Sequence, residues 1–288
     1  MDRNSLKLDL FEKIFVRVEH AKEESDTAYF LSLLYAGEQL TKITELGLLA
    51  GLQDDTERKK YSILYHLVRA DGIGEWSSYL EEILTGPSSH LLILEAKRIC
   101  KDLIQKVERN SWQYKAVALL HSSLIEIGED IEDLPVKVQG KTWFSMFARL
   151  RNKTRGHGAL PSKFYQSISR HLEQSIKLII NNFQLFDLEW AYLFQSLSGK
   201  YRVVKVSKTT NSYDYLKTKE ALKEHHENGI YIYLNSPLKI DLVETDVDLS
   251  DYLFPNGNFG TKRYDVLSYI SGNKDSKDNS KFLVPPSN

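Results

Sequence analysis

The sequence has only one cysteine, Cys100, in 288 residues. A single thiol excludes a disulfide framework and a cysteine-rich zinc site, and it suits the reducing cytoplasm. No stretch approaches about 18 consecutive apolar residues, and the N-terminus MDRNSLKLDLF has no apolar signal core, so we expect a cytoplasmic protein with no membrane segment. The net charge is −1, so any nucleic-acid site must be a local basic patch.

Several catalytic and metal-binding motifs are also missing. No G-x-x-x-x-G-K-[ST], G-x-S-x-G or H-E-x-x-H is present, and Ser198-Gly199-Lys200 is interpreted as a hairpin turn. The neighbouring pair His225-His226 lacks a third ligand at a useful spacing and is interpreted as surface. The acidic run from Asp246 to Asp251 lacks the glycine and glutamate of a calcium loop. The sequence therefore predicts no metal and no cofactor.

The first two-thirds of the chain has apolar residues at helical spacing. The pattern predicts a first helix over 9–24, a second that is capped by Asp26 or Thr27 and continues to 52, and a third that is capped by Asp54-Asp55. A short helix is expected around 76–83, and further helices over 90–109, 112–128 and 164–183. In the third of these, the predicted buried side comprises Tyr61, Ile63, Leu64, Leu67 and Val68. The break at 71–74 is interpreted as a helix–helix turn with Trp76 in the core, and Arg69 and Glu75 beside it are candidate secondary polar contacts.

Around Phe186 the apolar period changes from helix to strand. Segments 201–206, 229–234, 238–243 and 264–270 are rich in β-branched and aromatic residues, with turn signals between them, and 213–228 is expected to be a helix. The fold class is therefore predicted as α+β. We expect a helical domain over 1–186, a small antiparallel β-rich module over 187–271, and a flexible tail or linker over 272–288.

One stretch gathers residues that carry chemistry, from Lys141 to Ala159 (KTWFSMFARLRNKTRGHGA). It begins as an aromatic helix and then turns basic. Two glycines flank His157 and are expected to end the helix there, since on an unbroken helix residues six apart lie about 120° apart. The basic end contains Arg149, Arg151, Asn152, Lys153 and Arg155.

This cluster suits metal-independent RNA cleavage. A histidine near its natural pKa can accept a proton from a ribose 2′-hydroxyl or donate one to the leaving oxygen. The guanidinium of Arg151 matches phosphate oxygens and can stabilise the charge of the transition state, and Asn152 can orient the phosphate. Arg149, Lys153 and Arg155 would hold the flanking RNA backbone by charge.

An aromatic helix leading into Arg151-Asn152-x(4)-His157 near the end of a helical domain resembles the HEPN superfamily. Its active members are ribonucleases of toxin–antitoxin, CRISPR and anti-phage systems, and they usually work as dimers. The resemblance implies that Arg151 and His157 are the catalytic pair and Asn152 is the polar residue after the arginine. It also implies RNA as substrate, a homodimer, and a role as a bacterial defence or toxin effector.

A second resemblance covers most of the chain. The segments FLSLLYAGEQL, YHLVRADGIGEW, LRNKTRGHGA, LSGKYRVVKV and YLFPNGNF look like the N-terminal region of large bacterial proteins. In those proteins a HEPN-like segment precedes a STAND-type NTPase. This resemblance implies that the chain works with an NTPase domain, an antitoxin or a sensor partner, or belongs to a longer protein.

Two other interpretations remain open for the basic cluster. In one, the chain is a non-catalytic sensing or adaptor module whose basic patch binds a phosphorylated ligand, a nucleic acid or a protein partner. In the other, the cations are a solvated helix end favoured by the helix dipole, and His157 caps backbone carbonyls. A catalytic site depends on His157 and Arg151 together, whereas a binding patch depends mainly on Arg149, Lys153 and Arg155.

Overall fold

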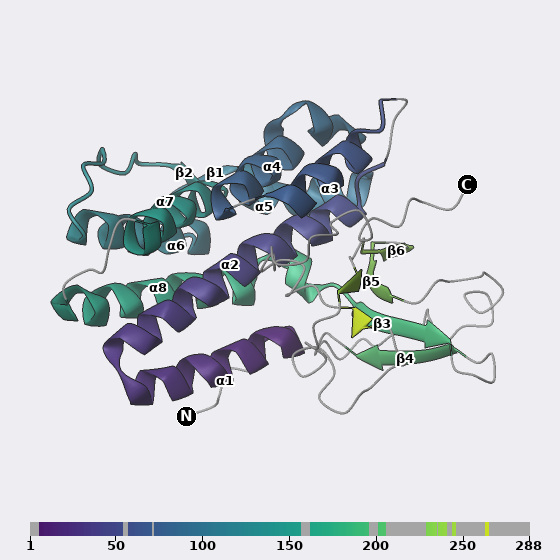
Figure 1. The fold of residues 1–288 in the computed structure, drawn as a ribbon. Coiled ribbons are helices and arrows are strands. Elements are labelled where there is room, and N and C mark those ends of the chain that lie inside the picture. The colour runs from purple at the N-terminus through teal and green to yellow at the C-terminus, as the bar shows by residue number, and fades with distance from the viewer. Residues whose placement is uncertain are drawn as a thin grey trace.

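The protein is mostly helical with small antiparallel sheets (Figure 1). The computed structural model describes residues 6–53, 57–70, 72–156, 162–195, 201–205, 229–234, 236–240, 244–245 and 263–264. In these residues the helices are α1 (Asp9–Glu24), α2 (Asp26–Ala50), α3 (Lys59–Arg69), α4 (Ile73–Thr85), α5 (Leu94–Ile104), α6 (Trp112–Glu126), α7 (Thr142–Gly156) and α8 (Ser162–Asn182). Two 3-10 helices, η1 (Pro87–Leu91) and η2 (Gln184–Asp187), join them.

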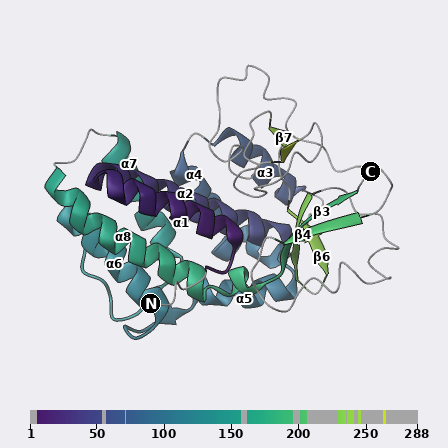
Figure 2. The same ribbon diagram turned by 90° about the horizontal axis from the view of Figure 1, so that it is seen from below.

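Helix α2 is the central element of the helical part. Ser25 begins it, because the Ser25 hydroxyl accepts a hydrogen bond of 3.0 Å from the backbone N–H of Ala28. The helix packs against α1, α4, α7 and α8, and Figures 1 and 2 show α1 and α8 running beside it. Because neighbours surround it, α2 is buried almost continuously from Tyr29 to Ala50.

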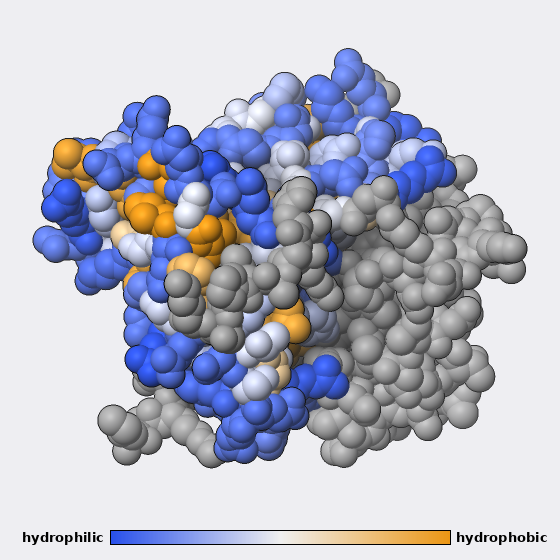
Figure 3. All heavy atoms as spheres, turned by 60° about the vertical axis from the view of Figure 1, so that its left-hand side comes forward, coloured by the Kyte–Doolittle hydropathy of each residue, from blue (hydrophilic) through white to orange (hydrophobic). Residues whose placement is uncertain are grey.

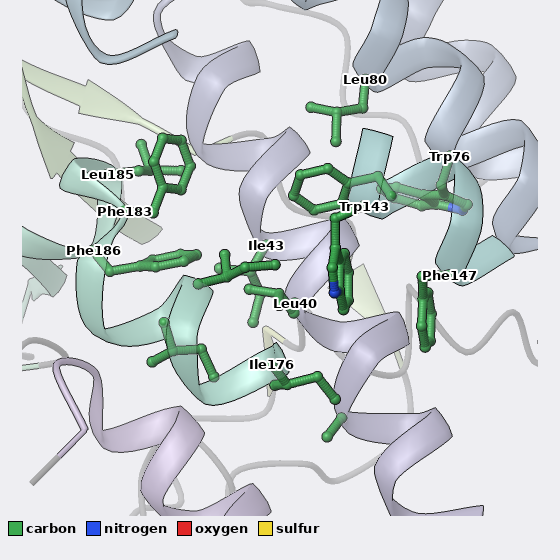
Figure 4. Packing of buried hydrophobic residues seen from close by; sticks show 14 of the residues in the cluster. Leu40, Ile43, Trp76, Leu80, Trp143, Phe147, Ile176, Phe183, Leu185 and Phe186 are labelled. Carbon is green, nitrogen blue, oxygen red and sulfur yellow. The ribbon is translucent and has the colours of Figure 1, made fainter. Parts of the chain in front are cut away.

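The core joins α2 to the aromatic face of α7 and to the end of α8 (Figure 4). Leu40 of α2 and Trp143 and Phe147 of α7 are completely buried. The rings of Trp143 and Phe147 stack with centroids 5.1 Å apart, and Phe183 and Phe186 meet edge to face at 5.6 Å. This packing fixes α7 along its apolar side and leaves its other side to solvent.

The largest sheet has four antiparallel strands in the order β4-β3-β5-β6. They are β3 (Trp190–Gln195), β4 (Tyr201–Lys205), β5 (Gly229–Tyr233) and β6 (Pro237–Lys239). Two short pairs, β1 (Lys106–Val107) with β2 (Val138–Gln139) and β7 (Glu244–Thr245) with β8 (Arg263–Tyr264), complete the described strands. Trp190 joins the main sheet to the helices, because its indole N–H donates to the Leu185 carbonyl at 3.0 Å.

The helical first part with antiparallel strands after it agrees with the predicted α+β class at this coarse level. The predicted helix over 90–109 is too long: α5 covers Leu94–Ile104, with η1 before it and β1 after it. The helix starts late because the Ile93 N–H bonds the Gly51 carbonyl and Leu92 bridges to Leu52. Strand β3 was not predicted. The expected helix 213–228 and most of strand 264–270 lie outside the described residues, and the boundary near residue 187 stays a prediction.

Candidate functional site at the end of helix α7

The position of the basic cluster is set by a close approach between α2 and α7. The ring of Phe147 lies where a side chain on Gly37 would stand, so only glycine at this position lets α7 come so near. One helical turn further along α7, Leu150 is also fully buried. The polar residues that follow are therefore carried by a helix whose apolar side is anchored in the core.

Arg151 lies on the side of α7 that faces α2. Its Nε donates to Oε1 of Glu38 at 2.7 Å, and the two side chains are 25% and 12% exposed. Beneath them is Lys42, one turn after Glu38 and almost completely buried. Burial lowers the pKa of Lys42 to about 8, with Arg151 acting in the same direction and the carboxylate of Glu38 opposing it. The guanidinium of Arg151 is thus held in place by a partly buried carboxylate.

Arg149 and Lys153 lie on the exposed side of α7 and share a different carboxylate. Glu129 accepts from Nε of Arg149 at 2.6 Å and lies 3.0 Å from Nζ of Lys153. Arg149 also donates to the Asp130 carbonyl at 3.2 Å. The hydrogen bonds from Lys153 and Arg149 lower the pKa of Glu129, so this carboxylate is ionised at neutral pH. A phosphate at this point would compete with Glu129 for two cations.

A groove of about 420 Å³ runs between α4 and α7 beside these cations. Asn152 is exposed on its wall, and Gly74 of α4 comes close enough that a Cβ there would lie 3.8 Å from Nδ2 of Asn152. The groove combines hydroxyls and an amide with two cations, which suits a polar, anionic ligand. Its lining residues are Gly74, Ser77, Ser78, Ser145, Ala148, Arg149, Asn152 and Lys153.

The structure therefore divides the predicted site residues. Arg149, Asn152 and Lys153 line one groove, whereas Arg151 lies on another side of α7 against Glu38. The described part of helix α7 extends to Gly156, and the predicted break of the helix around His157 stays a prediction. The side chain of Arg155 and all of His157 lie outside the described residues, so the pairing of Arg151 with His157 stays a prediction.

Four acidic or basic residues of this region were not predicted: Glu38, Lys42, Glu45 and Glu129. The first three recur at helical spacing among the apolar residues of α2, and such charges inside an apolar stripe are a signal for a buried polar layer. Glu45 is the extreme case. It is fully buried, neither of its oxygens has a hydrogen-bond partner in the described part of the chain, and burial raises its pKa well above the usual value.

The other candidate binding residues from the sequence add no second functional site among the described residues. Trp76 is buried as predicted, and the Glu75 carboxylate accepts from the Gly72 N–H at 3.2 Å, which fits a helix–helix turn. His225-His226, the acidic run 246–251 and residues 198–200 lie outside the described residues. Within the residues that are described, no group of three or more potential ligands could hold a metal ion, and no helix is both long and apolar enough to span a membrane.

Comparison with known proteins adds no relative: no family model matches the chain, and no curated protein and no solved structure matches it either.

Proposed function

We propose that this protein is a metal-independent endoribonuclease of the HEPN type that serves as a bacterial defence or toxin effector. His157 acts as general acid and base, Arg151 stabilises the phosphate, and Asn152 positions it. Arg149, Lys153 and Arg155 hold the neighbouring RNA backbone. The observation that carries the proposal is the presence of Arg149, Arg151, Asn152 and Lys153 at the end of α7, four to eight residues before His157 in the sequence.

The chemistry follows from the residue types. In the proposed step the imidazole of His157 accepts the proton of a ribose 2′-hydroxyl, whose oxygen attacks the adjacent phosphorus while the bond to the 5′-oxygen breaks. The protonated imidazole then gives this proton to the leaving 5′-oxygen, and a 2′,3′-cyclic phosphate remains. Arg151 offers its remaining N–H donors to the phosphate oxygens where negative charge accumulates. The ion pair with Glu38 supports this role because it restricts the guanidinium before RNA binds.

We further propose that the protein acts as a homodimer. Ile125 and Val136, before and after Glu129 in the chain, are 50% and 70% exposed. Figure 3 shows hydrophobic residues gathered among hydrophilic ones on part of the face that it draws. Apolar residues that a monomer leaves in water favour a contact between copies. Analytical ultracentrifugation of the wild type and of Val136→Glu tests this. A wild-type monomer at micromolar concentration would rule the homodimer out.

The test of catalysis is cleavage of a labelled RNA in EDTA. We expect cleavage by the wild type, and loss of it by about a hundredfold or more in His157→Ala and Arg151→Ala. Exposed residues elsewhere provide matched controls, His20→Ala on α1 and Arg98→Ala on α5, and both should cleave like the wild type. Unchanged cleavage in His157→Ala and Arg151→Ala would refute the proposal.

The second candidate is a non-catalytic sensing or adaptor module that binds a phosphorylated ligand. The convergence of Arg149 and Lys153 on one carboxylate favours it, because a phosphate group can replace Glu129 between the same two cations. This function requires ligand binding that survives His157→Ala and disappears when Arg149, Lys153 and Arg155 are neutralised. Cleavage that depends on His157 would exclude it.

A further inference from the structure

A row of aromatic rings lies at the surface of α3 and continues onto α4. Tyr61 and Tyr65 are one helical turn apart on α3 and stack with centroids separated by 6.5 Å. His66 follows, edge-on to Tyr65 at 5.7 Å, and it stacks on Tyr79 of α4 at 5.7 Å with the rings only 13° from parallel. The sequence predicted Tyr61 on the buried side of this helix, but Tyr61 is only half-buried and His66 is exposed. We call Tyr61, Tyr65, His66 and Tyr79 the aromatic row.

Two arginines lie against the aromatic row. The Cζ atom of Arg58 is 4.8 Å from the centre of the Tyr61 ring, and that of Arg69 is 3.9 Å from the centre of the Tyr65 ring. Both arginines are exposed. Arg58 has a φ of +55°, a left-handed conformation that is uncommon outside glycine, and it directly precedes α3. Rings and guanidinium groups together offer flat surfaces and positive charge.

The aromatic row adjoins the groove at the end of α7. Helix α4 packs on both α3 and α7, with Ser78 on the groove and the next residue, Tyr79, in the aromatic row. Arg69 ends α3 only three residues before Gly72 starts the turn into α4. Asp71 and Glu75 follow Arg69 in the sequence, and the Glu75 carboxylate caps the Gly72 N–H. Helix α4 has no lysine or arginine, so the cations of the groove and those of α3 are joined across α4 by Ser78 and the ring of Tyr79.

We propose that the aromatic row binds single-stranded RNA by stacking its unpaired bases while the phosphates lie along the neighbouring cations. The inference rests on the proposed function, because it extends the RNA site at the end of α7. Bases stack on tyrosine, histidine and arginine planes with little regard to sequence, and lysine and arginine supply the salt-dependent attraction to phosphate. Helix α3 itself carries the cations Lys59, Lys60 and Arg69 and no carboxylate, with Arg58 directly before it. A double helix hides its base faces, so RNA duplexes are poor ligands for this surface.

Fluorescence anisotropy with a labelled 2′-O-methyl RNA of about 12 nucleotides tests the inference, since this length falls within known single-strand sites. The probe lacks the 2′-hydroxyl that cleavage uses, so binding is measured without turnover. We expect Tyr65→Leu, which keeps the apolar bulk but removes the ring, to weaken binding of the single strand about 5- to 100-fold. His66→Ala should act in the same direction, and His20→Ala on α1 is the matched control. Tyr65→Phe keeps the ring but loses the hydroxyl to which Arg69 donates, so it should bind the single strand more tightly than Tyr65→Leu. Affinity for the corresponding duplex should not change in any variant.

The same variants are assayed for cleavage of ordinary RNA, which separates the two proposals. If the wild type cleaves RNA but Tyr65→Leu and His66→Ala bind the single strand unchanged, the aromatic row has no part in binding and the ribonuclease proposal survives. If Tyr65→Leu loses single-strand binding while no protein cleaves RNA, the aromatic row stands and the ribonuclease proposal fails. A wild type that binds no single strand at low salt, or binds duplex equally well, overturns the inference.

Discussion

Breaking the ion pair between Glu38 and Arg151 should cost a different amount of folding free energy depending on which of the two side chains is removed. Removing Arg151 leaves Glu38 beside Lys42, which still neutralises it. Removing Glu38 leaves Arg151 and the buried Lys42 facing each other, and these cations already oppose one another because Arg151 contributes to the lowered pKa of Lys42. We therefore expect Glu38→Ala to destabilise the fold more than Arg151→Ala.

The magnitudes follow from how exposed the pair is. Exposed pairs contribute about 0.2–1 kcal/mol, and breaking a fully buried pair costs about 3–5 kcal/mol. With Arg151 25% and Glu38 12% exposed, an intermediate value applies. We expect about 1 kcal/mol for Arg151→Ala, about 2–3 kcal/mol for Glu38→Ala, and a coupling of about 1 kcal/mol in the double variant.

Urea unfolding at pH 7 and low salt measures the full double-mutant cycle. Glu38→Gln is the matched control, since its amide oxygen still accepts from Arg151, and in it RNA cleavage should fall by less than about tenfold. The reasoning would be refuted if the two single variants lost equal stability and their losses added up to that of the double variant within about 0.5 kcal/mol. Such additivity means that the two side chains do not interact.

Three further perturbations test other parts of the fold by the same unfolding assay. Gly37→Ala places a methyl group in the ring of Phe147 and should cost about 1–3 kcal/mol; a neutral result would contradict the close approach of α2 and α7. Ser175→Ala removes the buried acceptor of the Trp143 indole N–H at 3.2 Å and should cost about 1–2 kcal/mol. Ser169→Ala deletes a buried hydroxyl that has no partner among the described residues, and it should be neutral or stabilising. The pKa of Lys42 is depressed from 10.5 to about 8 by folding, so between these two pH values the unfolded chain binds more protons than the folded one. The free energy of unfolding should therefore rise with pH across this range, by up to about 3 kcal/mol. This rise should be absent in Lys42→Met, and a variant with the same pH profile as the wild type would contradict the assignment.

Local patterns in the sequence were sufficient to predict most of the helices. Helix α1 has the predicted bounds because its apolar period is a local signal. Helix α2 begins at Asp26 after a Ser25 cap, whereas the sequence offered Asp26 or Thr27 as the cap; neighbouring Ser, Asp and Thr are all good caps, so the sequence does not single out one of them. The same period gave the wrong bounds over 90–109. The apolar run continues there, but the Ile93 N–H bonds the Gly51 carbonyl and the Gln53 N–H bonds the Leu91 carbonyl, and these contacts between distant segments are not visible in a local pattern. Strand β3 escaped prediction for a related reason: WAYLFQ is a nearly continuous apolar run, as is usual for a strand between two others, and it has no alternation to recognise.

The candidate site was predictable in composition but not in arrangement. The basic end of α7 is visible in the sequence because its cations are neighbours in the chain. Their partners are not, since Glu38 precedes Arg151 by 113 residues and Glu129 lies across a connector. The sequence treats Arg149, Arg151 and Lys153 as one patch, whereas the fold assigns them to two carboxylates on different sides of one helix.

That division supplies a test of what the exposed cations do. If Arg149 and Lys153 bind RNA phosphates, Glu129 competes with the ligand for both of them. Glu129→Gln should then strengthen RNA binding about two- to tenfold at low salt, a gain that shrinks as salt is added, while the fold loses no more than about 1 kcal/mol. If the cluster only stabilises the fold, Glu129→Gln should lose the same stability but should not bind RNA more tightly. Fluorescence anisotropy with the single-stranded RNA probe, together with urea unfolding, distinguishes these two roles. An RNA affinity that is unchanged or weaker in Glu129→Gln would mean that Arg149 and Lys153 stabilise the fold and do not bind the ligand.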